Sequence, residues 1–340
     1  MLSRLKLRHF RCFDAFEAEF APGLNFIVGP NARGKTSLIE AACILLRLQS
    51  PRAAKLGQAI QDTQRGLVID GYYAERHLQF YFSRERKKLA LDEVVQKTAH
   101  EYLQVGRLVW FANSDIDLAR GAGDVRRRFL DFVAAQREPG YRMALREFER
   151  ALRSRNLLLK SAKPRWREIA AFDEPLIAAG QRVTAARARL VDALREPTSA
   201  AHFAISGTRE KLGLKYEPGS GEDFAASLHA AREHDGRLRQ TTVGPHRDEV
   251  RFFLNDQPGD IASEGQQRTF VLALKLGAAR LLAEHFTMPP LLLLDDTFGE
   301  LDVDRRNALL AALPADSQKI ITTTHLDWMP DAGTAQVLRL

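Results

Sequence analysis

The sequence predicts an α/β protein with a parallel sheet and an inserted helical lobe, and three observations lead to this fold class. Strand-like and helix-like segments alternate towards the C-terminal end, a pattern typical of parallel strands joined by helices. A glycine-containing loop stands between an apolar strand and a helix near residue 30. Between these regions, residues 112–228 are rich in Ala, Leu and Arg and have the periodicity of amphipathic helices.

The order of elements follows from periodicity and turn residues. Residues 2–28 alternate apolar and polar side chains around a Pro22-Gly23 turn, which predicts strands, the last of them LNFIV at 24–28. The elements expected after it are a helix at 34–50, strands within 66–95, helices within 141–197, a strand and turn at 241–256, a helix at 264–286, a strand at 289–296, a helix at 303–314 and a strand at 319–325.

The change in character along the chain also predicts its division into lobes. Residues 1–111 are expected to form the N-terminal part of a first lobe, 112–228 a mainly helical second lobe, and 229–340 the part that completes the first lobe. No heptad run is long enough for an extended coiled coil.

Composition excludes several classes of protein. The 340 residues are 45% hydrophobic and 27% charged, as in soluble globular proteins, and the net charge of +7 is compatible with a polyanionic partner. Two cysteines, Cys12 and Cys43, support neither a disulfide framework nor a zinc cluster. The charged N-terminus is no signal peptide, and no apolar run could span a bilayer. We therefore expect a soluble cytoplasmic protein without a membrane partner.

The segment GPNARGKTS matches the phosphate-binding pattern G-x-x-x-x-G-K-[ST], and it stands in the expected context between a strand and a helix. Backbone N–H groups of such a loop wrap phosphates, the lysine reaches the β- and γ-phosphates, and the following hydroxyl binds Mg²⁺. The predicted nucleotide-binding residues are Gly29, Pro30, Asn31, Ala32, Arg33, Gly34, Lys35, Thr36 and Ser37.

Four leucines at 291–294 end in two adjacent carboxylates, Asp295 and Asp296. Buried carboxylates are costly unless they are paired or bound to a cation. In a phosphate-loop protein such a strand supplies the second half of the magnesium site, so Asp295 and Thr36 are the predicted metal ligands. Asp296 is then placed to orient or deprotonate the attacking water. The alternative is a strand that simply runs out into an acidic turn.

Three further segments resemble motifs of ABC-type ATPases and follow in the expected order. SEGQQR at 263–268 resembles the signature motif, ELD at 300–302 the D-loop, and TTTH ending at His325 the switch-histidine loop. Taken alone, SEGQQR could be only a polar helix start, because Ser263 is also a suitable N-cap.

The chain as a whole resembles the RecF family. The segments that carry this resemblance are LRHFRCF at 7–13, FAPGLNFIVGPNARGKTSLIEA at 20–41, RRRFLDF at 126–132, ALRSRNLLLK at 151–160, TVGPHRDEV at 242–250, EGQQRTFVLALKLGAARLL at 264–282 and LLLLDDTFGELDVDRR at 291–306. They run through nearly the full chain, and RRRFLD and GPHRDE are not general features of ABC ATPases.

The resemblance implies an ABC-type P-loop ATPase head with an inserted α-helical second lobe and no long coiled coil. It implies a homodimer that forms head-to-tail on ATP, binds DNA in that state, hydrolyses ATP slowly with Mg²⁺, and helps load RecA at gaps with RecO and RecR. The residues carried over are Lys35, Asp296 and His325 for catalysis, Ser263, Gly265 and Gln266 for the γ-phosphate held by the partner subunit, and Glu300 and Asp302 for the D-loop. Asp296 is one methylene shorter than the glutamate of transporter-type ATPases, which favours slow turnover.

Two groups of arginines are candidates for contact with duplex DNA or with a single-strand/duplex junction. Arg126, Arg127 and Arg128 form the densest basic run, and Arg146, Arg150, Arg153 and Arg155 lie near one helix face that Lys160, Lys163, Arg165 and Arg167 extend. Such a face could neutralise phosphates without reading bases. Equally, these charges could be solvated surface, and RRRFLD could be a packing element. The GPHRDE segment could be a structural turn or a sensor that couples the lobes.

Three functions remain open from the sequence. The first is an ATP-dependent DNA-binding protein of recombinational repair and replication-fork maintenance. The second is a RecF-like ABC ATPase with a non-repair role, for example in a defence system. The third is a structural module that holds ATP and barely hydrolyses it.

Overall fold

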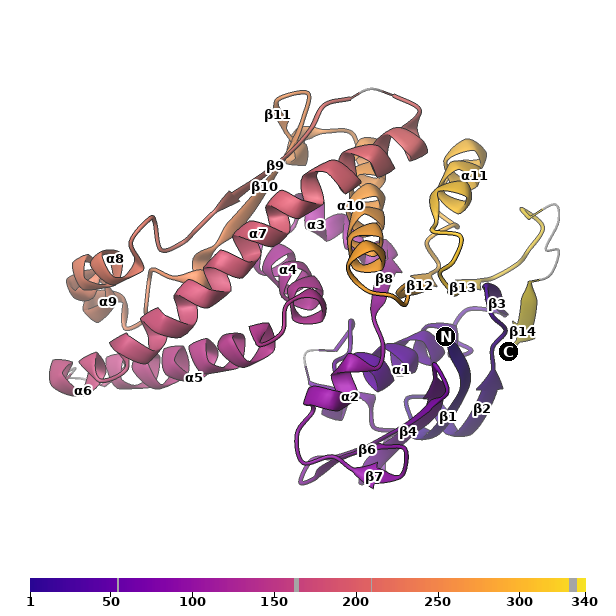
Figure 1. Cartoon of the computed structure of the whole chain (residues 1–340), viewed down its shortest axis with the longest axis horizontal. Helices are drawn as coiled ribbons and strands as arrows, with labels where there is room; N and C mark the ends of the chain where they lie inside the picture. Colours follow the sequence, from indigo (N-terminus) through magenta and orange to yellow (C-terminus); the bar gives the residue numbers. More distant parts are fainter. Residues whose placement is uncertain (54, 162–164, 209, 330–334) are drawn as a thin grey trace. The chain divides into compact units, whose positions relative to one another are not determined.

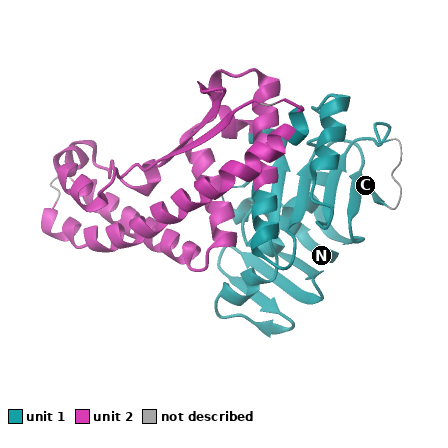
Figure 2. Cartoon of the chain, turned by 45° about the horizontal axis from the view of Figure 1, so that its top comes forward, with its two compact units in different colours: residues 1–115, 204–206, 278–340 teal, residues 116–203, 207–277 magenta. Residues whose placement is uncertain are grey.

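The computed structural model describes residues 1–53, 55–161, 165–208, 210–329 and 335–340. The chain divides into two compact units (Figure 2). Unit 1 contains residues 1–115, 204–206 and 278–340, and unit 2 contains residues 116–203 and 207–277. None of the described helices is long and apolar enough to cross a membrane.

Unit 1 contains the parallel sheet that the C-terminal alternation predicts (Figure 1). Its strands, in spatial order, are β14 (Gln336–Arg339), β3 (Leu24–Val28), β13 (Lys319–Thr323), β12 (Leu291–Asp295) and β8 (Leu108–Ala112). The four leucines of β12 are buried, as expected for a central strand of a parallel sheet. Because all the pairings are parallel, the carboxyl ends of β3, β13 and β12 lie at one edge of the sheet.

A second sheet of unit 1 is antiparallel and is built from hairpins, as the alternating N-terminal sequence predicts. Its order is β2 (Phe13–Glu19), β1 (Leu2–Phe10), β4 (Gly66–Tyr73), β5 (Arg76–Ser83), β6 (Lys87–Leu91) and β7 (Val94–Val95). Along each strand, buried side chains alternate with more exposed ones. Leu5 and Leu7 of β1 and Ile69 of β4 are among the buried side chains.

Helix α1 (Lys35–Arg47) contacts strands of both sheets of unit 1 and forms its core. Every residue of this helix except Thr36 is buried. The sequence contains no Gly or Pro within the helix, and it is apolar on all sides, which is the pattern of a helix enclosed by protein. Gly34 precedes the helix in a left-handed conformation (φ +96°), and Leu48 ends it in another (φ +57°). Unit 1 also contains α2 (His100–Gln104), α11 (Val303–Ala312) and the C-terminal end of α10 (Glu264–His285).

One carboxylate is enclosed in this core. Glu40 of α1 is fully buried and accepts two hydrogen bonds from the guanidinium of Arg11, at 2.9 and 2.7 Å. Ser50 Oγ donates a third at 2.6 Å, and Arg52 lies 3.5 Å away. The burial of Glu40 is therefore compensated by charge and hydrogen bonds, and the β1–β2 turn is attached to α1.

Unit 2 combines helices with a small antiparallel sheet (Figure 1). Its strand order is β11 (Gln257–Pro258), β10 (Glu249–Leu254) and β9 (Leu212–Glu217). Its helices are α3 (Asp117–Arg120), α4 (Gly123–Arg137), α5 (Tyr141–Leu159), α6 (Trp166–Ala170), most of α7 (Asp173–Ser206), α8 (Phe224–Ala230), α9 (Arg232–Leu238) and the first part of α10.

The second unit differs from the predicted mainly helical lobe at 112–228. It begins at Ile116 and continues to Gly277, and it contains a sheet. The physical reason is a long-range pairing: β10 aligns with β9 from Glu249↔Glu217 to Leu254↔Leu212, which keeps residues after 228 in this unit. The start of α10 follows, because Phe270 packs on Phe252 with ring centroids 4.6 Å apart. Local periodicity carries no signal for such a pairing.

We expect Glu40→Ala to lower the free energy of unfolding by about 3 kcal/mol, because it leaves two guanidinium groups without their buried partner. Urea denaturation measures this loss. Glu17→Ala is the control: Glu17 is paired with Arg4 and Lys6 at the surface, where water and salt screen the charges, and its removal should cost far less stability. Equal losses for both variants would contradict a structural role of the Glu40 pair.

Candidate functional site

The glycine-containing loop connects β3 to α1 at the carboxyl edge of the parallel sheet. Pro30, Asn31, Ala32 and Arg33 are exposed, whereas Gly29 is buried. A side chain at Gly29 would lie 2.7 Å from the carbonyl oxygen of Leu340, so only glycine fits there. At Gly34 a side chain would collide with the ring of Phe13, 2.5 Å away, and the backbone is left-handed.

Lys35 and Ser37 open α1 with buried side chains. The ammonium group of Lys35 donates hydrogen bonds to the carbonyl oxygens of Gly29 (2.6 Å) and Pro30 (2.9 Å). The lysine is thus held within the loop, at the N-terminus of a helix whose first amides have no partner within the helix. A loop of this kind is suited to phosphate.

The two predicted metal ligands lie in direct contact. Thr36 Oγ1 donates a hydrogen bond of 2.8 Å to Asp295 Oδ1, although the two residues are 259 positions apart. The neighbouring strand supplies a second donor: Thr322 Oγ1 donates to the same oxygen at 2.9 Å. The register of β12 with β13 places Asp295 beside Thr322, which explains this contact.

The electrostatics at Asp295 favour a cation. Burial raises the pKa of its carboxyl group and the negative charge of Asp296 raises it further, whereas the hydrogen bonds from Thr36 and Thr322 and the charge of Arg52 lower it. The oxygens of Thr36 and Asp295 are the type of ligand that Mg²⁺ binds, usually with waters and substrate phosphates completing the shell. Among the described residues, no group of three or more His, Cys, Asp or Glu side chains is arranged so that it could hold a metal ion.

Asp296 follows in a strained backbone conformation, with φ at +50°. Its N–H donates to Thr322 Oγ1 at 2.9 Å. Burial raises the pKa of Asp296, the positive charges of Lys35 and His325 lower it, and the negative charge of Glu300 raises it. Asp296 is therefore close enough to Lys35 and His325 to interact with them electrostatically. The sequence predicts all three residues as catalytic, and they come from three separate segments.

His325 lies on the loop after β13, with its side chain 62% exposed. Its carbonyl oxygen accepts hydrogen bonds from Thr323 Oγ1 (2.8 Å) and from the indole N–H of Trp328 (2.9 Å). The Trp328 ring stacks on Phe298, which follows Asp296, with centroids 5.2 Å apart. The loops after β12 and β13 are therefore joined by packing.

The predicted signature residues belong to unit 2, whereas the phosphate loop belongs to unit 1. Ser263 Oγ accepts from the N–H of Gln266 (3.3 Å), and Gln266 Oε1 accepts from the N–H of Ser263 (3.0 Å). This reciprocal pair is a capping box at the start of α10, so the N-cap role of Ser263 is confirmed. Gly265 lies within the same turn. Contact of these residues with a phosphate stays a prediction.

The two D-loop residues precede α11. Asp302 is its N-cap, because Asp302 Oδ1 accepts from the N–H of Arg305 at 2.9 Å. Glu300 is exposed and contributes to the charge around Asp296.

The structure corrects the predicted DNA contacts. Arg155 is only 1% exposed and is paired with Asp235 and Asp173, so it cannot contact a phosphate at the surface. Arg126 donates two hydrogen bonds to Glu249, and Arg127 donates to the backbone oxygen of Asp248. These arginines hold unit 2 together, so two of the three arginines of RRRFLD are packing residues within that unit.

The remaining candidates are exposed. The side chains of Arg128 and Arg153 are each 70% accessible and form ion pairs with the carboxylates of Asp124 and Glu149. Arg146, Arg150, Lys160, Arg165 and Arg167 are also exposed, and Lys163 lies outside the described residues.

Thr322 is the residue of the site that the sequence prediction missed. The sequence pattern of TTTH points only to its histidine, whereas the first hydroxyl of this run, Thr322 Oγ1, contacts both Asp295 and Asp296. Only the register between the parallel strands β12 and β13 reveals this role of Thr322, and no local sequence pattern gives that register.

Comparisons with known proteins agree with this geometry. The family model described as RecF/RecN/SMC N terminal domain matches residues 1–339. The DNA replication and repair protein RecF of Synechocystis sp. is 36% identical over 368 residues, covering 100% of this chain and 96% of the relative. A solved structure of the recombination mediator protein RecF-ATP in the RecFOR pathway aligns with a TM-score of 0.86 and 28% identity over 95% of this chain and 92% of that chain. An Smc head bound to the C-winged helix domain of ScpA shares the fold alone, at a TM-score of 0.55 and 15% identity over 96% of this chain and 90% of that chain.

The chain belongs to the RecF family.

Membership of the RecF family accounts for the site and for the rest of the fold. The chain has the α/β head of the RecF and SMC ATPases, with a P-loop of the ABC type, and its described residues form no long coiled coil. This confirms the predicted fold class. The two segments that set RecF apart from other ABC-type proteins in the sequence, RRRFLD and GPHRDE, lie together in unit 2.

We expect Thr322→Val to reduce the rate of ATP hydrolysis about 10- to 100-fold, because Asp295 would keep only the hydroxyl of Thr36 as a donor and the N–H of Asp296 would lose its acceptor. Steady-state hydrolysis of ATP with Mg²⁺ measures the rate, and binding of a fluorescent ATP analogue without Mg²⁺ should change little. Thr324→Val, at an exposed position two residues later, is the control. A Thr322→Val protein with the original rate would show that this hydroxyl has no role in the site.

Proposed function

We propose that this chain is an ATP-dependent DNA-binding protein of recombinational DNA repair and replication-fork maintenance. ATP drives its dimerisation, the dimer binds DNA, and slow hydrolysis releases it. In this role it works with RecO- and RecR-like mediators to help load RecA at gaps.

The observation that carries the proposal is the hydrogen bond between Thr36 and Asp295, which joins the phosphate loop to the acidic end of β12. Two segments from opposite ends of the chain thereby form one site with the donors and the charge that ATP and Mg²⁺ need. The full-length similarity to proteins named RecF supports the DNA role, and the similarity to a structure named RecF-ATP supports the nucleotide.

In this mechanism the phosphate loop and Lys35 bind the β- and γ-phosphates, and Lys35 exchanges the carbonyls of Gly29 and Pro30 for phosphate oxygens. Thr36 and Asp295 would hold Mg²⁺, which neutralises charge on the phosphates. Asp296 orients the attacking water, and His325 interacts electrostatically with its carboxylate. The short side chain of Asp296 and its fixed backbone keep the carboxylate back from the γ-phosphate, and turnover is slow.

Dimerisation follows from the division of motifs between units. Ser263, Gly265 and Gln266 in one subunit bind the γ-phosphate held by the phosphate loop of the other, and Glu300 and Asp302 form the D-loop contact. ATP then acts as part of the interface, so loss of the γ-phosphate separates the subunits.

We expect Ser263→Ala to retain ATP binding within about twofold but to lose ATP-dependent dimers. The substitution also removes an N-cap, which costs about 1 kcal/mol of stability. Light scattering with and without ATP measures the dimer. Asp223→Ala is the matched control, since Asp223 caps α8 of the same unit by accepting from the N–H of Ala226 at 3.0 Å. Normal dimers of the Ser263→Ala protein would overturn the role of the signature in the partner's site.

The surface that we assign to DNA is the exposed face of α5. Met143, Arg146, Arg150, Arg153 and Leu157 recur every three or four residues and are all exposed. No described residue pairs with the guanidinium of Arg146 or Arg150, and Glu147 is occupied by Arg182 from α7. Arg146 and Arg153 are about 10 Å apart along the helix, a length that covers about three phosphates of one DNA strand.

The first experiment is binding of labelled duplex DNA with and without ATP–Mg²⁺ across a salt series. We expect binding only with ATP, and affinity that falls steeply with salt. The double variant Arg146→Ala/Arg150→Ala should lower the slope of log K against log salt by about 2.

The control for this surface is Arg189→Ala/Arg195→Ala on α7, where both arginines are exposed but paired with carboxylates, and its slope should not change. If the Arg146→Ala/Arg150→Ala protein keeps the original slope, α5 is not part of the DNA-binding surface. No DNA binding by the original protein in any nucleotide state would leave an ABC-type ATPase of non-repair role.

A further inference from the structure

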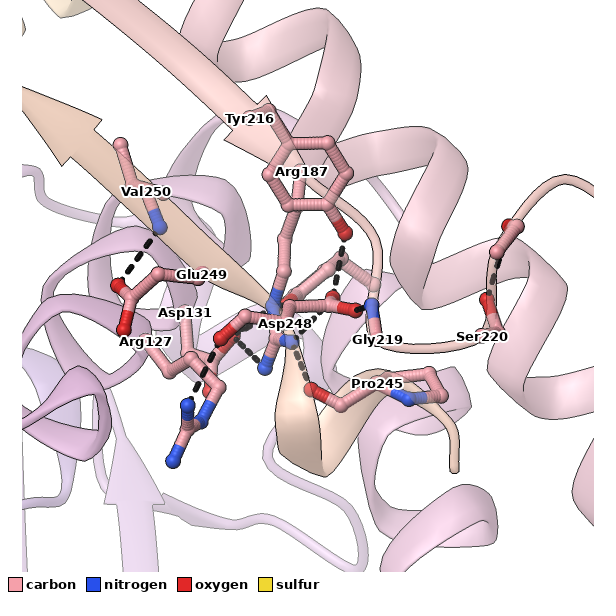
Figure 3. Close-up of polar contacts among 12 residues, drawn as sticks. Arg127, Asp131, Arg187, Tyr216, Gly219, Ser220, Pro245, Asp248, Glu249 and Val250 are labelled. Atoms are coloured by element: carbon pink, nitrogen blue, oxygen red, sulfur yellow. Dashed lines mark hydrogen bonds and ion pairs between the residues drawn. The ribbon is translucent and has the colours of Figure 1, made fainter. Parts of the chain in front are cut away.

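The GPHRDE turn is fixed by a buried ionic network in unit 2. The carboxylate of Asp248 is fully buried and accepts hydrogen bonds from Arg187 (2.8 Å), from the N–H of Gly219 (2.9 Å) and from the hydroxyl of Tyr216 (Figure 3). Arg187 of α7 also donates to the carbonyl oxygen of Pro245 at 2.7 Å. Both ends of the turn are therefore attached to one buried guanidinium.

The RRRFLD segment of α4 completes this network. Arg127 donates to the carbonyl oxygen of Asp248 at 2.7 Å, and Arg126 holds the carboxylate of Glu249 at 2.6 and 3.0 Å. Asp131 binds the other side of Arg187, at 2.9 and 2.8 Å. Figure 3 shows Arg127, Asp131 and Arg187 around Asp248. The two segments that are specific to this family thus form one structural unit.

The backbone of the turn is clamped as well. Gly244 has φ +124° and ψ −179°, a conformation open to little but glycine, and a side chain there would lie 2.8 Å from the ring of Phe224. At Gly219 a side chain would lie 2.5 Å from the carbonyl carbon of Arg247. Two glycines therefore let a second loop press directly against the backbone of Arg247, and the N–H of Arg247 donates to the carbonyl oxygen of Gly244 at 2.8 Å.

His246 is held on the protein side of the turn. Its Nε2 lies 2.9 Å from the carbonyl oxygen of Thr241, and its ring packs near Phe148. Burial lowers the pKa of His246 to about 4, so it is neutral at physiological pH and adds no charge to the turn. Pro245 and Asp248 are also buried.

Arg247 is the exception in this turn. Its side chain is exposed, and no described residue forms a hydrogen bond or an ion pair with its guanidinium. Arg128, Arg189 and Arg251 are exposed in the same unit and each have a carboxylate partner, whereas Arg247, like Arg146 and Arg150 of α5, has none among the described residues. When a guanidinium on a fixed backbone binds a ligand, only the side chain and not the loop has to be ordered.

The cost of the network also points to a function. Buried ion pairs contribute little net stability and can often be replaced by apolar residues without loss, whereas they fix geometry. Here seven polar groups from α4, α7, β9 and two loops determine where a single exposed arginine stands.

We propose that Arg247 is a phosphate-binding residue that contacts the backbone of DNA, and that the Asp248 network is the device that positions it. The proposal rests on the DNA-binding function inferred above and adds a specific contact to it. A planar guanidinium with two parallel donors suits the oxygens of a phosphodiester group.

Arg247→Ala and Arg247→Lys test the proposal in the DNA titration with ATP–Mg²⁺ over a salt series. We expect Arg247→Ala to weaken binding about 5- to 10-fold near 0.1 M salt and to lower the salt slope by about 1. Arg247→Lys should keep the slope and recover part of the affinity, because it keeps the charge but not the paired donors. The side chain is exposed, so the thermal unfolding of both variants should match that of the original protein.

Arg251→Ala is the control, since Arg251 is exposed on β10 and paired with Glu217 at 2.7 Å. Arg247→Ala with the affinity and slope of the original protein would overturn the proposal while the DNA function stood. Weakened DNA binding together with lost ATP-dependent dimers would assign Arg247 to a contact between copies and would also overturn the proposal. If the original protein binds no DNA in any nucleotide state, the proposed function and this contact both fail.

Discussion

The enclosure of α1 between two sheets is the constraint on which unit 1 depends. A helix buried on all sides cannot shift or rotate without opening the core, so its first turn is fixed against β3, β12 and β13. That first turn carries Lys35 and Thr36. Two ties, the Thr36–Asp295 hydrogen bond at its N-terminus and the Glu40–Arg11 pair one turn further along, connect the helix to both sheets. The stability of unit 1 and the positions of Lys35 and Thr36 therefore have the same origin.

The order of strands explains why four segments distant in sequence form one site. In a parallel sheet all carboxyl ends meet at one edge, and here β13 lies between β3 and β12. Residues of β13, the middle strand, can therefore form hydrogen bonds with residues of both neighbouring strands. Thr322 holds Asp295 and the backbone of Asp296, while Thr323 accepts the N–H of Gly29 and fixes the His325 loop. Each contact is a consequence of register, and a shift by one residue would remove them all.

The sequence predicted what depends on local pattern and missed what depends on distant pairing. The phosphate loop, the β12 strand and the helices were predictable because glycine spacing, apolar runs and helical periodicity are local signals. The β9–β10 pair and the role of Thr322 were not, since register between segments leaves no trace in either one. The arginines show the same limit: Arg153 and Arg155 are two positions apart on α5, yet one is exposed and the other is in the core beside Asp235. Helical spacing places the two on opposite faces, and Arg155 continues the buried stripe of Phe148, Ala151 and Leu159; what the spacing does not reveal is the distant carboxylate that lets an arginine stand there.

The two interpretations of SEGQQR, an N-cap and a phosphate-binding signature, are compatible on chemical grounds. In the capping box Ser263 Oγ is an acceptor, so its own O–H remains available as a donor. Gln266 uses its oxygen for the N–H of Ser263 and one amide N–H for Glu210, and a second amide N–H is left. A phosphate at the start of α10 would meet these donors together with the N-terminal end of the helix dipole. The capping box thus uses the acceptor oxygens of Ser263 and Gln266 and leaves one donor on each, so binding a phosphate need not break the cap.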